Sequence, residues 1–181
     1  MTSRVPTDHG MVGVRHWGGG APAVVLLHGA GGNRDSLAPL GDALHARGVD
    51  VAALSMPGRP GSEGDPAESL ADAAAVVAAA LEVLAPDGAV LLGHSMGGGV
   101  AIETALTTGA RLRGLVLAAT GARLRVHPRI LELAASTAAD GGHLAELSAL
   151  SLRPDGPPEG REHVLAADAA TPGSTGVADW E

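Results

Sequence analysis

The alternation of apolar, strand-like runs with helical segments constrains this chain more than any other feature. Four such runs lie at 21–29, 49–56, 88–95 and 112–120. The first contains consecutive apolar residues from Val24 to Leu27, which is typical of a strand covered on both faces. Helical segments separate the runs, so the sequence predicts an α/β fold with a mostly parallel, doubly wound sheet and right-handed crossovers.

Helices are expected between these strands, over residues 33–47, about 65–84, and 97–109. Asn33 is the expected cap of the first helix, and Gly48 is expected to end it. Asp65, Pro66 and Glu68 are expected to begin the second helix. The apolar stripes facing the core would be Leu37, Leu40 and Leu44 in the first helix, and Leu70, Ala74, Val77 and Leu81 in the second.

The two ends of the chain differ from this central pattern. Residues 11–17 alternate in polarity and predict an outer antiparallel strand. After residue 120 the sequence predicts only short helices, over 128–137, 142–152 and 161–170. We therefore divide the chain into residues 1–120, in which strands and helices alternate, and residues 121–181, which contain only short helices.

The amino-acid composition excludes several chemistries. The chain has 181 residues with no Cys, Tyr or Phe, and all twelve basic residues are Arg. A thiol nucleophile, a Cys-ligated zinc, a Schiff-base lysine and a lysine-containing phosphate loop each need a residue that is missing. The sequence indicates no metal site and no cofactor.

The net charge and the hydropathy of the chain limit the kinds of partner that it is expected to bind. A formal net charge of -8 makes nucleic-acid binding unexpected. The longest apolar run, residues 73–81, is much shorter than the roughly 20 residues of a membrane span, and the first ten residues contain no apolar signal core. We expect a cytoplasmic protein that contacts neither nucleic acid nor membrane.

The strongest chemical motif is GHSMG at residues 93–97, between a predicted strand and a predicted helix. Gly93 and Gly97 would permit a sharp turn that exposes the hydroxyl of Ser95, as in a nucleophile elbow. The plainer interpretation is that Ser95 only caps the following helix.

A second glycine-rich motif, HGAGGN at residues 28–33, follows the first buried strand. Because ligands gather at the carboxyl ends of parallel strands, this loop is expected to lie near Ser95. The backbone N–H groups of Ala30 and Met96 could then converge on one oxygen and stabilise its negative charge.

Four stretches, VVLLHGAGGN, LSMPGRPGSEG, VLLGHSMGGGVAIETAL and LRGLVLAATGARLRV, together resemble the α/β-hydrolase family of esterases, lactonases and carbon-carbon hydrolases. The resemblance covers roughly residues 20–126. It implies Ser95 as nucleophile and the N–H groups of Ala30 and Met96 as the oxyanion hole. It also implies that His28, beside Gly29, braces the loop. In such a protein residues 1–120 would be the N-terminal part of the core, and residues 121–181 would form a helical cap over the pocket.

One departure concerns the strand at 49–56, where relatives often carry an Asp and a Gly-His-Gly turn. This chain has Ser55 and PGRPGSEG there, and Ser62 and Glu63 are interpreted as turn residues.

The larger departure concerns the general base and the acid, which in this fold follow Ser in the order Asp or Glu, then His. The histidines after Ser95 are His127, His143 and His163, and acids in the same region include Asp140, Asp155 and Asp168. None of these follows an apolar strand, so no base or acid is assigned in this chain.

We expect from this that the chain is truncated at its C-terminus before both residues. The 181 residues alone would then hydrolyse weakly or not at all, because loss of a triad histidine lowers turnover about a millionfold in a serine protease. The run at 112–120 would be an exposed sheet edge through which copies could associate.

Three functional hypotheses follow. The first is a serine hydrolase that cleaves a small ester, lactone or related acyl substrate through an acyl-enzyme. The alternative is a non-catalytic ligand-binding or scaffold protein of the same fold. A dinucleotide-binding oxidoreductase is a weaker hypothesis, because Arg34 stands at the third glycine position of that fingerprint and Ser55 replaces the acid that would hold a ribose.

Overall fold

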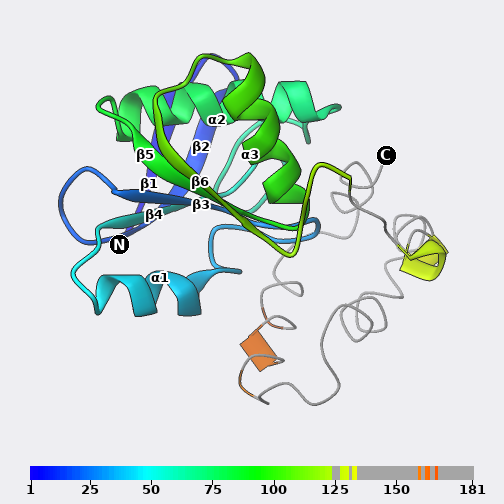
Figure 1. Cartoon of the computed structure of the whole chain (residues 1–181), viewed down its shortest axis with the longest axis horizontal. Coiled ribbons are helices and arrows are strands. Elements are labelled where there is room, and N and C mark those ends of the chain that lie inside the picture. The colour runs from blue at the N-terminus through cyan, green and yellow to red at the C-terminus, as the bar shows by residue number, and fades with distance from the viewer. Residues whose placement is uncertain (124–126, 131, 134–158, 160–161, 164–165, 167–181) are drawn as a thin grey trace.

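The structure is a computed structural model that describes residues 1–123, 127–130, 132, 133, 159, 162, 163 and 166. Within them a six-stranded sheet has the order β1-β2-β4-β3-β5-β6 (Figure 1). The strands are β1 (Thr2–Thr7), β2 (Gly10–Trp17), β3 (Val24–Leu27), β4 (Val51–Leu54), β5 (Ala89–His94) and β6 (Leu112–Ala118). The helices are α1 (Ala38–His45), α2 (Leu70–Leu84) and α3 (Met96–Thr107).

The predicted parallel core is confirmed. Strand β3 pairs in parallel with β4 and β5, and β5 pairs in parallel with β6. Strand β2 is antiparallel to β4, as predicted, but the prediction that it is the outer strand is wrong, because β1 pairs with its other edge. Strand β1 was not predicted, because it is a polar edge strand in which Val5 is the one residue classed as buried.

Helices cover both faces of the sheet, with α2 and α3 on one face and α1 on the other (Figure 1). Ala74, Val77 and Leu81 of α2 are buried in the larger core, as their spacing predicted. Leu37, Leu40 and Leu44 line the smaller core beneath α1. Leu70, the first residue of the predicted α2 stripe, is instead 48% exposed.

The start of α1 differs from the prediction. The helix begins at Ala38, with Leu37 in the cap position and Pro39 in its first turn. Asn33 does not cap it, since the Asn33 side chain accepts a hydrogen bond from the N–H of Asp35 at 2.8 Å. A short side chain that binds its own backbone two residues on forms a turn that competes with helix. Gly48 does follow the helix in the left-handed region, with φ of 80°.

The start of α2 also lies later than predicted. Its cap is Ser69, whose hydroxyl accepts from the N–H of Asp72 at 3.1 Å and donates to the Asp72 carboxylate at 2.6 Å. Asp65 and Pro66 precede this cap in the loop. The sequence contains both starting signals, and the reciprocal pair of Ser69 and Asp72 determines the boundary.

The predicted helices after residue 120 fall largely outside the described residues, so the division at residue 120 stays a prediction. Across the described ranges, no helix is long and apolar enough to cross a membrane. Strand β6 lies at one end of the sheet, and Leu115, Val116 and Leu117 are 38%, 44% and 40% exposed. Among the described residues, β6 is therefore an apolar sheet edge, as the sequence predicted, and association of copies through it stays a prediction.

Candidate active site

Ser95 lies in a sharp turn between β5 and α3. Its φ of 52° and ψ of -121° fall outside the regions that non-glycine residues ordinarily occupy. Its N–H donates to the carbonyl of Ala118 at 2.9 Å, and its carbonyl accepts from the N–H of Gly98 at 2.9 Å. Such a backbone conformation costs on the order of 1–3 kcal/mol and persists only where the surroundings enforce it.

The Ser95 side chain does not cap the helix. Ser95 occupies the cap position of α3, but its hydroxyl makes no capping hydrogen bond. The interpretation of this serine as a structural cap is therefore wrong. Ser95 lies at the N-terminus of α3, where the first N–H groups lack partners within the helix.

Two glycines let the elbow pack closely. A Cβ on Gly93 would collide with the backbone of Gly97 and Gly98, and a Cβ on Gly97 would collide with the carbonyls of Leu27 and His28. The first turn of α3 therefore lies directly against the end of β3. This contact places Ser95 beside the loop that begins at His28.

Gly29 brings that loop against Ser95. A Cβ on Gly29 would lie 3.2 Å from the Cβ of Ser95 and 3.1 Å from Nδ1 of His94. Ala30 follows directly in the turn, and within the described residues no backbone hydrogen bond uses its N–H. The two motifs that the sequence singled out thus meet at the carboxyl ends of β3 and β5.

His28 holds the loop from beneath. The side chain is fully buried, with 1% exposed, and its Nδ1–H donates to the carbonyl of Gly29 at 2.8 Å. Its Nε2 accepts from the N–H of Met56 at 3.1 Å, which fixes the neutral tautomer. The ring therefore links the loop after β3 to the loop after β4.

The pKa of His28 is lowered to about 4, chiefly by burial and also by the neighbouring charges of Arg59 and His94, which together outweigh the hydrogen bond to Gly29. His28 is consequently neutral at pH 7. Arg59 is 2% exposed, and burial lowers its pKa to about 10, so it keeps its positive charge. Burial also lowers the pKa of His94.

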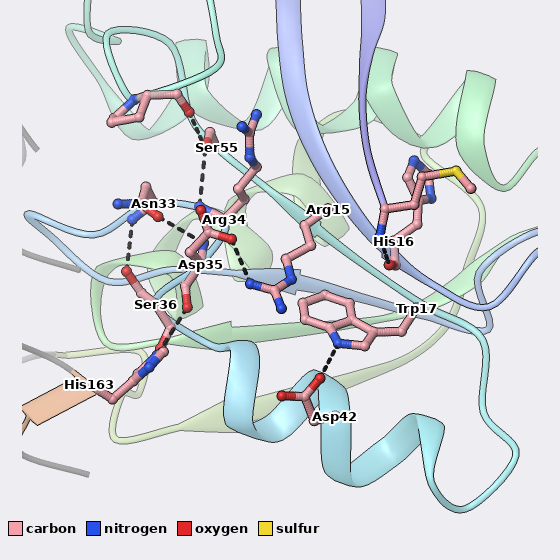
Figure 2. A network of polar contacts seen from close by, with 12 residues as sticks. Arg15, His16, Trp17, Asn33, Arg34, Asp35, Ser36, Asp42, Ser55 and His163 are labelled. Atoms are coloured by element: carbon pink, nitrogen blue, oxygen red, sulfur yellow. Dashed lines mark hydrogen bonds and ion pairs between the residues drawn. The ribbon is translucent and has the colours of Figure 1, made fainter. Parts of the chain in front are cut away.

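Ser55 fastens the same loop at a second point. Its hydroxyl is fully buried, accepts from the N–H of Arg34 at 3.0 Å and donates to the carbonyl of Pro60 at 2.9 Å (Figure 2). Ser62 donates to the Ser55 carbonyl at 2.7 Å and accepts from the N–H of Gly13. Ser55 thus forms hydrogen bonds that hold neighbouring loops together. This role gives no support to the dinucleotide-binding hypothesis.

A chain of polar contacts continues from Asn33 toward α1 (Figure 2). The hydroxyl of Ser36 accepts from the N–H of Asn33 at 2.9 Å, and Arg15 forms an ion pair with Asp35 at 2.8 Å. The Arg15 guanidinium also lies 4.7 Å from the centre of the Trp17 ring. This network holds the segment after the glycine-rich loop against β2.

The structure describes two of the three histidines that follow Ser95 in the sequence. His163 Nε2–H donates to the carbonyls of Asp35 at 3.0 Å and Ser36 at 3.2 Å, so this side chain is bound to the segment before α1 (Figure 2). His127 accepts from the N–H of Arg129. His143, like the acids Asp140, Asp155 and Asp168, lies outside the described residues. The general base and acid stay unassigned.

Sequence reasoning missed Ser55 and Arg59 as parts of this site. It treated Ser55 only as the replacement for an acid, and no local pattern shows that Arg59 is buried beside His28. A turn-rich loop such as PGRPGSEG indicates exposure on average, and only the tertiary contacts reveal the exceptions.

The chain belongs to the alpha/beta hydrolase family, whose pattern it matches over residues 24–181. It is 38% identical over 105 residues to the dihydrolipoyllysine-residue acetyltransferase component of the acetoin cleaving system of Cupriavidus necator. That match covers 55% of this chain and 27% of the relative, so this chain corresponds to about a quarter of the relative's length.

Solved structures share the fold. An esterase from Exiguobacterium antarcticum superposes with a TM-score of 0.85 at 18% identity, over 99% of this chain and 72% of the esterase. An epoxide hydrolase from Vigna radiata gives a TM-score of 0.76 at 18% identity, over 99% of this chain and 70% of the enzyme. At this identity the likeness shows the fold alone.

The elbow contact predicts opposite effects for two glycines of α3. Gly97→Ala should lower the free energy of unfolding by at least about 2 kcal/mol, because the new methyl meets backbone that cannot move aside. Gly99→Ala is the matched control, since its methyl meets only the Leu70 side chain at 3.7 Å. It should stabilise the helix by up to about 1 kcal/mol. Urea unfolding measures both, and equal effects would contradict the close contact.

The buried neutral state of His28 predicts a dependence of stability on pH. With a folded pKa of about 4 against 6.5 in the unfolded chain, the unfolded state binds more protons between these values. Stability present above pH 6.5 should therefore be lost as the pH falls toward 4, by about 3 kcal/mol in total. Urea unfolding from pH 7 to pH 4.5 measures this loss.

His28→Gln is the control for that experiment. Glutamine does not titrate, so the variant should be less stable at pH 7 but should lose less stability on acidification. His16 and His94, whose pKa values are also lowered, remain in both proteins. Equal slopes in the two proteins would show that His28 is not the residue responsible.

Proposed function

We propose that this protein is a serine hydrolase in which Ser95 is the nucleophile for a small ester, lactone or related acyl substrate. The observation that carries the proposal is the strained, uncapped Ser95 at φ 52°, packed against the HGAGGN loop. A strained serine whose hydroxyl makes no capping bond has no structural purpose in α3. The family membership and an esterase among the structural neighbours support the same proposal.

In this proposal the Ser95 oxygen attacks the acyl carbon as a base takes its proton. The carbonyl oxygen becomes an oxyanion that accepts hydrogen bonds from the N–H groups of Ala30 and Met96. One such donor contributes about 3–4 kcal/mol to the transition state. The C–O bond to the alcohol then breaks, the alcohol takes the proton, and water hydrolyses the acyl-enzyme to regenerate Ser95.

The surrounding residues would keep the oxyanion loop in place during these steps. Neutral His28 holds Gly29, the residue before Ala30, and Ser55 holds the N–H of Arg34 at the other end of the loop. Because both side chains are fully buried, the loop would need little reorganisation as the charge develops. The base and its orienting acid remain part of the proposal without assigned residues.

The proposal is tested by treating the full-length protein that the gene encodes with a fluorophosphonate probe. The probe should modify Ser95, as shown by peptide mass spectrometry, and Ser95→Ala should abolish both labelling and hydrolysis of p-nitrophenyl esters. Ser3→Ala is the matched control, because the exposed Ser3 hydroxyl lies 2.7 Å from Nε2 of His16 but does not stand in a strained strand-to-helix turn. It should leave labelling unchanged.

Two outcomes would contradict the proposal. Labelling that persists in Ser95→Ala would place the nucleophile elsewhere. A correctly folded protein that neither labels nor hydrolyses any ester or lactone would favour the non-catalytic ligand-binding alternative.

A further inference from the structure

A cavity of about 360 Å³ lies between the C-terminal half of α2 and the turn that precedes β6. Helices α2 and α3 lie beside each other on one face of the sheet (Figure 1), and the cavity is at their C-terminal ends. Ligand sites are typically hollows of roughly 300–1,000 Å³ with a mostly apolar lining, so this cavity has the size for a small ligand. Its apolar lining consists of Ala78, Leu81, Ala85, Pro86 and Ala110.

The cavity is remote from the candidate active site. Pro86 and Ala110 precede β5 and β6, whereas Ser95 follows β5. Because β5 and β6 are parallel, the cavity and Ser95 lie at opposite ends of the sheet, separated by the roughly 20 Å that the six residues of β5 span. An inference about the cavity therefore does not depend on the proposed hydrolase activity.

Two side chains of opposite charge, Glu82 and Arg111, line the same cavity. Both are exposed and both are described, yet no carboxylate oxygen of Glu82 lies within 4.0 Å of a guanidinium nitrogen of Arg111. Arg111 donates to the carbonyl of Pro86 at 3.5 Å, which is long for such a bond. Most of its five N–H donors are therefore left for another acceptor.

The ends of the two helices make the side of Glu82 more negative. The last carbonyls of a helix carry partial negative charge, and neither α2 nor α3 has a basic residue in its last turn. Glu82 adds a carboxylate near the end of α2, where a negative charge is unfavourable. A cation bound beside Glu82 would be stabilised both by its carboxylate and by the helix end.

We propose that this cavity binds a small α-amino acid with an apolar side chain. The ammonium group of the ligand pairs with Glu82 at the end of α2. Its carboxylate accepts a forked pair of hydrogen bonds from Arg111, which matches the planar geometry of a guanidinium. The apolar side chain lies on the alanine and leucine side chains of the lining. A molecule with a single charge uses only one of the two charged residues, so the cavity selects a zwitterion.

Isothermal titration calorimetry with L-leucine tests the proposal in the full chain. Isocaproate lacks the ammonium group of leucine, and isoamylamine lacks its carboxylate. Leucine should bind at least about tenfold more tightly than either analogue, because each analogue loses one charge-assisted contact. Added salt should weaken leucine binding, because both charged side chains are exposed.

Charge variants test the two contacts separately. Glu82→Gln and Arg111→Gln should each weaken leucine binding at least about tenfold. Asp87→Asn and Arg113→Gln are the matched controls, because these exposed residues make the same changes in net charge but do not line the cavity. Both controls should leave the affinity unchanged.

A pair of alanines on α2 tests the position of the site. Ala78→Leu places a larger side chain in the cavity and should abolish leucine binding. Ala79→Leu is the matched control, since Ala79 is also half-buried on α2 but does not line the cavity, and it should bind leucine normally. Circular dichroism should show that both variants are folded.

Three results would overturn the proposal. The first is the absence of any heat of binding with leucine, and the second is an analogue that binds as tightly as leucine. The third is leucine binding that survives Arg111→Gln or Ala78→Leu, which would place the ligand elsewhere. Ser95→Ala should bind leucine as the unmodified chain does, so failure of the hydrolase proposal would leave these measurements unaffected.

Discussion

The close approach of two backbones, at the start of α3 and the end of β3, is the constraint on which the candidate site depends. Gly97 fits there because a side chain would collide with the carbonyls of Leu27 and His28. The same contact fixes the strained conformation of Ser95 and leaves its hydroxyl without a capping role. Packing between β3 and α3 thereby stabilises a conformation that the serine would not adopt in an isolated peptide.

This constraint also connects the elbow to the loop after β3. His28 lies at the junction, since its carbonyl borders Gly97 and its ring joins Gly29 to Met56. The ring must be neutral to accept from Met56, and burial with a nearby Arg59 keeps it so. Ser55 then joins the far end of the loop to the end of β4, so the loop is held by buried hydrogen bonds from the ends of β3 and β4.

Much of the fold could be predicted from the sequence because its signals are local and strong. The apolar runs that became β3 and β4 have consecutive buried residues, as expected for strands covered by helices on both faces of the sheet. The two glycine-rich motifs likewise predicted that Ser95 and Ala30 lie at strand ends. Family membership confirms the resemblance that these motifs carried.

The remaining features depend on contacts that local patterns do not encode. Both Asp65 and Ser69 are residue types that cap helices, and α2 begins at Ser69 because the Ser69 hydroxyl accepts the N–H of Asp72. Asn33 forms a turn instead of a cap because its side chain accepts the N–H of Asp35. Strand β1 has no alternation of apolar and polar residues. It forms through antiparallel backbone pairing with the edge of β2. The burial of Ser55 and Arg59 follows from the path of a turn-rich loop, which composition does not predict.

The central claim is that the β3 loop and the α3 terminus form one oxyanion site around Ser95. A crystal structure of the phosphonylated protein tests it most directly. The account predicts phosphorus bonded to the Ser95 oxygen, with one phosphonyl oxygen about 2.7–3.1 Å from both the Ala30 and Met96 nitrogens. An adduct on another residue, or a phosphonyl oxygen that contacts neither N–H group, would contradict the account.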